Sequence, residues 1–229
     1  RPDQVSWLSA EEKTYLTENY EKERAAMQRV KKYSVLKAFR DPKVLKLCLI
    51  YFLWVVGFWG FYFWMPTVLK ELSGLSNSLL GGAIAIPMMA ALIVQLIISK
   101  TATITGDKVW HVFGTLFVGA VGLTLSPFAS NLTIALILVC LSAIGIHAAM
   151  GVWWTIPTTF LTGPAAAGSI ALINSCGNLG GWVGPNMMAW VKVTTGSFDL
   201  GYFIMGGAML LSGLPVLTVK YNLFGRKNE

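Results

Sequence analysis

Long apolar segments alternate with short polar ones along most of the chain. Each apolar segment approaches the roughly 20 residues that a helix needs to cross the hydrocarbon core of a bilayer, and none contains an acidic residue. The period-two alternation that marks the strands of a membrane barrel is absent. The pattern therefore predicts an all-α integral membrane protein with six transmembrane helices, near residues 44–66, 79–99, 111–128, 132–150, 165–190 and 200–219.

Composition supports the bilayer as the solvent and argues against an enzyme. The chain has 229 residues, of which 55% are hydrophobic and 13% charged, whereas soluble domains carry about 25% charged residues. Its three cysteines, Cys48, Cys140 and Cys176, show neither a disulfide framework nor metal-ligand spacing. The apolar segments lack a convincing set of acids, Ser/His pairs or metal ligands. We expect a protein that is not an enzyme and that needs no cofactor or metal.

The basic residues predict the orientation. Ten of the 18 Lys and Arg residues precede Val44. Lys100 and Lys108 lie between the second and third predicted spans, whereas the connectors on the opposite side offer only Lys70 and Lys192. Because cytoplasmic loops carry the excess of Lys and Arg, both termini are expected in the cytoplasm, with the protein multi-pass in the cell membrane.

Residues 1–43 form a separate predicted element, a cytoplasmic basic linker, ahead of a transmembrane domain over residues 44–229. Ser9 and Glu12 have the spacing of a capping box, which predicts an amphipathic helix from there to about Arg29. The basic stretch that follows is expected to touch anionic lipid. The chain opens on Arg-Pro-Asp without an initiator Met, which indicates a piece of a longer protein.

The fifth predicted span carries the most informative polar residues. Asn174, Asn178 and Trp182 recur every four residues and so share one helix face. Amides are costly against lipid, so they must face protein or a water-filled cavity. They either bind a polar substrate or bond a neighbouring helix. Gly184 and Pro185 predict a break or kink near the outer end of this span.

Aromatic residues provide further candidates for a cavity wall. Tyr62 lies deep in the first span, where a ring with a polar group suits a binding site, although simple packing is the alternative. Trp153 and Trp154 follow the fourth span and either line the cavity or belong to the interfacial belt. His147, near the end of the fourth span, is interpreted as a packing residue rather than a proton carrier.

Four segments carry a resemblance to a known family: WLSAEEK (residues 7–13), GFYFWMP (60–66), AIP (85–87) and GSIALINSCGNLGG (168–181). With them, the whole chain resembles the C-terminal half, helices 7–12, of a transporter of the major facilitator superfamily. The nearest group is the anion:cation symporter family, with its bacterial tartrate-type and sugar-acid permeases. The resemblance implies two three-helix inverted repeats here, over residues 44–128 and 132–219, and a substrate site between two six-helix halves.

The resemblance also implies a function. Proteins of this kind carry a small organic anion, such as a hydroxy-dicarboxylate or a sugar acid, by cation symport with alternating access, and the cation is commonly a proton. The implied partners are that anion, the cation, the N-terminal six-helix half and the lipid bilayer, with no nucleic acid. The substrate-binding residues would be Tyr62, Asn174 and Asn178, with Trp153 and Trp154 as weaker candidates. The alternative is a self-contained six-helix channel or scaffold that acts as a homodimer.

The loop between the second and third spans departs from the family pattern. The superfamily places an Asp and an Arg there, whose ion pairs hold the cytoplasmic gate shut. Thr103 and Ile104 occupy those places here, while the Gly106-Asp107-Lys108 turn and Trp110-His111 are retained. The predicted gating-loop residues are Lys100, Gly106, Asp107 and Lys108. The sequence therefore predicts a weaker gate that favours inward-open states, or else an inactive copy.

Overall fold

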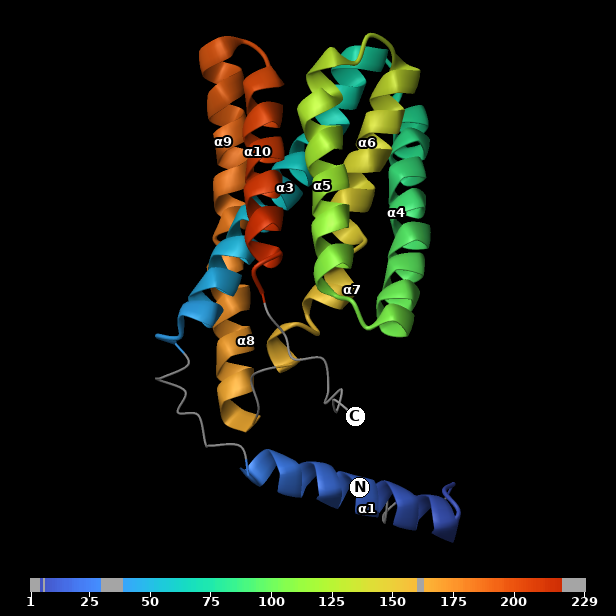
Figure 1. The fold of residues 1–229 in the computed structure, drawn as a ribbon. Coiled ribbons are helices and arrows are strands. Elements are labelled where there is room, and N and C mark those ends of the chain that lie inside the picture. Colours follow the sequence, from blue (N-terminus) through green and yellow to red (C-terminus); the bar gives the residue numbers. More distant parts are fainter. Residues whose placement is uncertain (1–4, 6, 30–38, 160–162, 220–229) are drawn as a thin grey trace.

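The computed structural model describes residues 5, 7–29, 39–159 and 163–219. All secondary structure in these residues is helical (Figure 1). The elements are α1 (Ala10–Arg29), α3 (Pro42–Ser73), α4 (Asn77–Thr105), α5 (Val109–Leu125), η2 (Ser126–Phe128), α6 (Leu132–His147), α7 (Met150–Trp153), η3 (Pro157–Thr159), α8 (Gly163–Asn178), α9 (Gly180–Thr195) and α10 (Asp199–Val216). Helices α3 to α10 form a bundle, and α1 lies apart from it (Figure 1).

The N-terminal helix begins as its sequence predicts. The Ser9 backbone N–H donates to Glu12 Oε2 at 2.9 Å, and the Glu12 N–H donates to Ser9 Oγ at 3.2 Å. This reciprocal pair is the predicted capping box. Hydrogen bonds to the Glu12 carboxyl from the backbone N–H and then from the hydroxyl of Ser9 hold the pKa of that carboxyl below its ordinary value. The basic stretch after Arg29 falls largely on residues 30–38, outside the described part of the chain.

Helix α3 is the central element of the bundle. It begins where Asp41 Oδ1 accepts the Lys43 N–H at 2.8 Å, with Pro42 in the first turn, and ends at Gly74, whose φ of 64° is left-handed. Two buried polar groups attach it to its neighbours. Trp54 Nε1 donates to the Ile146 carbonyl of α6 at 3.0 Å, and Ser212 Oγ of α10 donates to the Ile50 carbonyl at 2.8 Å.

Glycines let the central helices approach closely. A Cβ added at Gly180 of α9 would stand 2.6 Å from the Phe52 carbonyl oxygen of α3, and one at Gly184 would overlap the Val56 carbonyl. In the other part of the bundle, a Cβ at Gly145 of α6 would overlap the backbone of Gly119 in α5. Because lipid supplies no hydrophobic force between helices, such close contact is a main source of membrane helix association.

The helices do not pack as two separate sequential triplets. The first helix of each predicted triplet packs against the second and third of the other: α3 contacts α8, α9 and α10, whereas α6 contacts α4 and α5. The two third helices, α5 and α10, also pack on each other. If the helices of one triplet are renamed as their counterparts in the other, the same set of helix contacts results, so the contact pattern is symmetric.

Five of the helical segments among the described residues are long and apolar enough to cross a membrane: Pro42–Ser73, Asn77–Thr105, Val109–Phe128, Leu132–Thr159 and Asp199–Val216. The predicted fifth span, near 165–190, is instead two consecutive helices of 16 residues each, α8 and α9. The count of six long helices is therefore not confirmed.

The interruption falls at Leu179, and not at the predicted Pro185, through which α9 continues. Glycine is a poor helix former, and Gly177 and Gly180 lie close to Leu179 on either side. The α3 helix likewise continues through Pro66 to Ser73, although the pattern predicted its end at residue 66. In both places neighbouring helices support a proline that the local pattern reads as a stop.

The packing predicts different costs for two glycine substitutions in membrane-spanning helices. Gly145→Ala must push α6 away from α5, which costs about 1–3 kcal/mol of stability by overpacking. Gly207→Ala, in α10, meets nothing within 4 Å, and its melting temperature should match the unsubstituted chain or exceed it slightly. Thermal unfolding of the detergent-solubilised variants measures the difference. Equal melting temperatures would contradict the close α5–α6 contact.

Candidate functional site

A wall of aromatic rings crosses the middle of α3. The Tyr62 ring stacks on Phe58, with centroids 5.4 Å apart, and lies 6.4 Å from the Trp59 ring. The Tyr62 hydroxyl donates to the Met88 sulfur of α4 at 2.9 Å. Trp59 is 44% exposed, so the wall has an open side. Tyr62 is thus held by packing while its hydroxyl points toward the α3–α4 boundary.

His147 of α6 lies behind this wall. Its ring meets Phe58 and Tyr62 edge-on, with centroids 5.1 Å and 5.5 Å away. Its Nε2 is buried and has no hydrogen-bond partner among the described residues. The packing role inferred from the sequence therefore describes its ring contacts, whereas the unpartnered nitrogen is a feature that only the structure reveals.

The amide pair lies on the exposed face of α8. Asn174 and Asn178 are both exposed, and Asn178 Nδ2 donates to Asn174 Oδ1 at 3.2 Å. Trp182, on the same side after the interruption, is 72% exposed. The two amides therefore bond to each other and not to a neighbouring described helix, which leaves their remaining N–H and carbonyl groups available to another molecule.

The α3 wall and the α8 amides meet through two glycines. A Cβ at Gly181 would lie 2.9 Å from Cδ1 of Trp59, and one at Gly177 would overlap the Tyr51 ring. Gly177 sits between the two asparagines in sequence, and Tyr51 belongs to α3. The structure thus packs Tyr51 and Trp59 of α3 against the glycines next to the amide pair, whereas Tyr62 contacts α4 through Met88.

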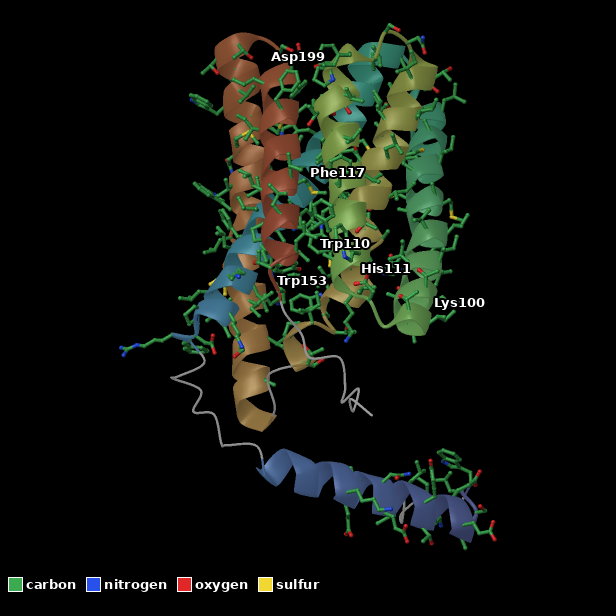
Figure 2. The ribbon with its side chains drawn as sticks, in the orientation of Figure 1. Lys100, Trp110, His111, Phe117, Trp153 and Asp199 are labelled. Atoms are coloured by element: carbon green, nitrogen blue, oxygen red, sulfur yellow. The ribbon has the colours of Figure 1, made fainter. Side chains whose placement is uncertain are left out.

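Trp153 and Trp154 take different positions around Tyr51. Trp153 is fully buried, stacked on Tyr51 at 6.0 Å and edge-on to Trp54 at 5.9 Å. Trp154 is half-buried and meets Tyr51 edge-on at 5.0 Å. In this conformation the two tryptophans support the ring that contacts Gly177, and Trp153 does not reach the exposed face (Figure 2). Tyr51 was not singled out by the sequence, because it is one of many aromatic residues in its span.

The gating loop is ordered by local bonds. Gly106 ends α4 with a left-handed φ of 69°. Asp107 Oδ1 then accepts the Trp110 N–H at 3.2 Å, and Lys108 Nζ donates to the Thr155 carbonyl at 3.3 Å. Partial burial holds the pKa of the Lys108 ammonium below its usual value. The loop is therefore attached to the segment that follows α7.

Exposed residues border this loop at one end of the bundle. Lys100 is exposed, and Figure 2 shows it at the end opposite Asp199. Ile104 is 73% exposed, and the Thr103 hydroxyl donates to its own helix, to the Ser99 carbonyl at 2.8 Å. Thr103 and Ile104 stand where the family places an Asp and an Arg. Because neither side chain is charged, neither forms the ion pair that the family has there.

An ion pair at the opposite end was not anticipated from the sequence. Lys192 of α9 donates to Glu71 Oε2 of α3 at 3.0 Å and stands 4.3 Å from the centroid of the Phe198 ring. The two charged residues are 121 positions apart, so no local pattern could pair them. The pair ties the end of α3 to the end of α9.

The long apolar helices of the bundle indicate a multi-pass membrane protein. The family model of the Major Facilitator Superfamily matches residues 5–185. The chain belongs to this superfamily, whose members are transporters and not enzymes.

Relatives agree on the class and differ in what they are named for. The chain is 37% identical over 219 residues to a protein named "Putative tartrate transporter" from Agrobacterium vitis, covering 96% of the chain and 50% of that protein. It is 33% identical to a "Quinolone resistance transporter" from Acinetobacter baumannii, over 96% of the chain and 50% of that protein. It is 30% identical to the inner membrane transport protein RhmT of Escherichia coli (strain K12), over 96% and 51%. The chain thus spans about half the length of these relatives.

Water should reach the amide pair if the two asparagines line a polar cavity, and should not reach it if they face lipid. In a background with Cys48, Cys140 and Cys176 replaced by Ser, Asn178→Cys should react with a charged, membrane-impermeant maleimide. Leu211→Cys is the matched control, since Leu211 of α10 is 58% exposed on an apolar stretch and should react at least tenfold more slowly. Mass spectrometry of labelled membranes measures both rates. Equal rates would show that the amide pair does not face water.

Proposed function

We propose that this chain supplies the C-terminal half of a secondary active transporter that carries a small organic anion by cation symport with alternating access. The observation that carries the proposal is the Asn174–Asn178 pair. Two mutually bonded amides on the exposed face of a membrane-embedded helix are costly unless a polar partner meets them. The relatives, about twice as long as this chain and named as transporters, support a partner half and a transported molecule.

The chemistry of the site supports a hydroxylated or carboxylated substrate. The amide N–H groups donate to carboxylate and hydroxyl oxygens, and Asn178 Oδ1 accepts from hydroxyl groups. The Tyr62 hydroxyl and the Trp59 face provide a polar group and an apolar surface beside them. The described residues of the predicted spans include no Asp, Glu or Arg. The described acidic residues after Val44 lie in the connectors between these spans. Charge compensation and proton coupling are therefore assigned to the N-terminal half, as the family resemblance implies.

We further infer that the bundle holds six spans arranged as two inverted repeats. The contact pattern supports this arrangement, because exchange of the two triplets preserves every main helix pair. In it, α8 and α9 together form one span, because Leu179 between them keeps right-handed helical angles, with φ −59° and ψ −30°. Both termini are placed in the cytoplasm of a cell-membrane protein by the excess of basic residues before α3 and in the α4–α5 loop.

Uptake tests the transport proposal. The chain, joined to the upstream half of one of its relatives, should take up labelled hydroxy-dicarboxylates or sugar acids when an inward pH gradient is imposed. Asn178→Ala should raise the half-saturating concentration about tenfold, the loss of one or two hydrogen bonds. Asn186→Ala is the control, because the Asn186 amide donates to its own helix, to the Trp182 carbonyl at 2.7 Å.

Two outcomes would count against this assignment. If Asn178→Ala and Asn186→Ala raise the half-saturating concentration equally, the effect arises from disturbance of the helix and not from a binding site. Uptake by the unjoined chain alone would instead favour a self-contained homodimer.

The gating loop gives an independent test of alternating access. Thr103→Asp combined with Ile104→Arg restores the charged residues that the superfamily places in this loop, and both positions are exposed enough to accept them. The double variant should shift the population toward outward-open states. Accessibility labelling of a cavity cysteine from each side of the membrane measures the shift. Unchanged labelling would refute the weaker latch.

A further inference from the structure

The contact between α3 and α8–α9 follows a regular register. Tyr51 faces Gly177, Phe52 faces Gly180 and Val56 faces Gly184. The contacting residues advance together along both helices, so α3 and the α8–α9 pair run parallel through this contact. A residue four positions before Phe52 should therefore meet one four positions before Gly180.

Those two positions are Cys48 and Cys176. Cys48 is 7% exposed in the core, Cys176 is half-buried, and both are free cysteines. The two thiols are near enough to interact with each other. They are 128 residues apart in sequence, and the register of the helix contact alone accounts for their meeting.

The close approach of the two helices favours a disulfide at this contact. A disulfide needs Cα atoms about 4.4–6.8 Å apart and facing Cβ atoms. Close approach of the backbones is enforced one turn away, where a Cβ at Gly180 would stand 2.6 Å from the Phe52 carbonyl oxygen. Side chains at the preceding rung therefore bridge a short gap. Cys140, the third cysteine, lies on α6, away from this contact.

We propose that Cys48 and Cys176 form an oxidation-sensitive dithiol that closes to a disulfide across the α3–α8 contact. The co-reactant is a peroxide. In the first step the more exposed Cys176 sulfur attacks a peroxide oxygen, and the thiol becomes a sulfenic acid as one water leaves. In the second, the Cys48 sulfur attacks the sulfenic sulfur, the S–S bond forms and a second water leaves. Two thiols are oxidised and one H₂O₂ is reduced to two waters.

The bond would join two surfaces of the candidate site. Cys176 lies two residues after Asn174 and two before Asn178, and Cys48 lies one turn before Tyr51 and Phe52. A disulfide between Cys48 and Cys176 would fix the helix that carries the two asparagines against the aromatic wall of α3. The inference concerns the chain itself and does not depend on the transport proposal.

Thiol counting tests the dithiol. Membranes containing the full chain are treated with hydrogen peroxide, quenched with acid, denatured, and alkylated with a maleimide. The untreated chain should take three labels, one for each free cysteine. After oxidation the monomer should take one label, located on Cys140 by peptide mass spectrometry, and dithiothreitol should restore all three. A peptide pair joined through Cys48 and Cys176 should appear at the same peroxide dose.

Single-cysteine variants identify which two thiols pair. Cys176→Ser should take two labels both before and after peroxide, and Cys140→Ser should fall from two labels to none. Cys48→Ser should fall from two labels to one, because its Cys176 stops at the sulfenic acid, and dithiothreitol should restore the second label. Three retained labels in the unsubstituted chain would overturn the proposal. So would a loss of labels that dithiothreitol does not reverse, because that marks sulfinic acids rather than a disulfide. A disulfide that joins two chains through Cys140 would also overturn it.

Discussion

Close backbone contact between α3 and the α8–α9 pair is the constraint on which the rest of the bundle depends. In a bilayer, apolar side chains gain little by leaving lipid for another apolar surface, so packing and hydrogen bonds must hold helices together. Gly180 and Gly184 provide that packing, because any side chain there would displace the α3 backbone. With α3 in place, Trp54 can reach the Ile146 carbonyl and Ser212 can reach the Ile50 carbonyl. These two bonds connect α3 to α6 and to α10.

The same contact builds the candidate site. Glycines at 177 and 181 bring Tyr51 and Trp59 against the helix that carries the two asparagines. Larger residues at those positions would separate the amide pair from the aromatic wall. Glycine also weakens the helix locally, and the interruption at Leu179 lies between these two positions. Close packing and the one-residue interruption thus occur beside the same glycines.

Charge is distributed in a way that complements this apolar interior. In the bundle, the described charged side chains lie toward the ends of helices and in connectors, such as Lys192 with Glu71 at one end and Lys108 with the Thr155 carbonyl at the other. The middle of the bundle relies on neutral groups, including the amides, the Tyr62 hydroxyl and the unpartnered nitrogen of His147. Neutral hydrogen-bonding groups can exchange partners within a membrane at lower cost than charges can, which fits the transport role proposed above.

Sequence alone determined the features that depend on neighbours along the chain. Hydropathy and length identified five of the six predicted spans as helices long enough to cross a membrane. The spacing of Ser9 and Glu12 predicted the start of α1, which the structure confirms. The family was also readable from four short segments. The prolines predicted a helix end at Pro66 and a break at Pro185, and neither occurs, because both residues lie inside continuous helices.

Only the tertiary structure decided which helices meet. It placed Trp153 in the core and left the two asparagines exposed. It also packed the first helix of each predicted triplet against the second and third helices of the other triplet. It also paired Glu71 with Lys192 and Cys48 with Cys176 across more than a hundred residues. Periodicity reports which side of a helix is apolar, but nearly every side is apolar in a membrane span. The choice of partner then depends on backbone shape and side-chain fit between distant segments, which become defined only when the helices are packed.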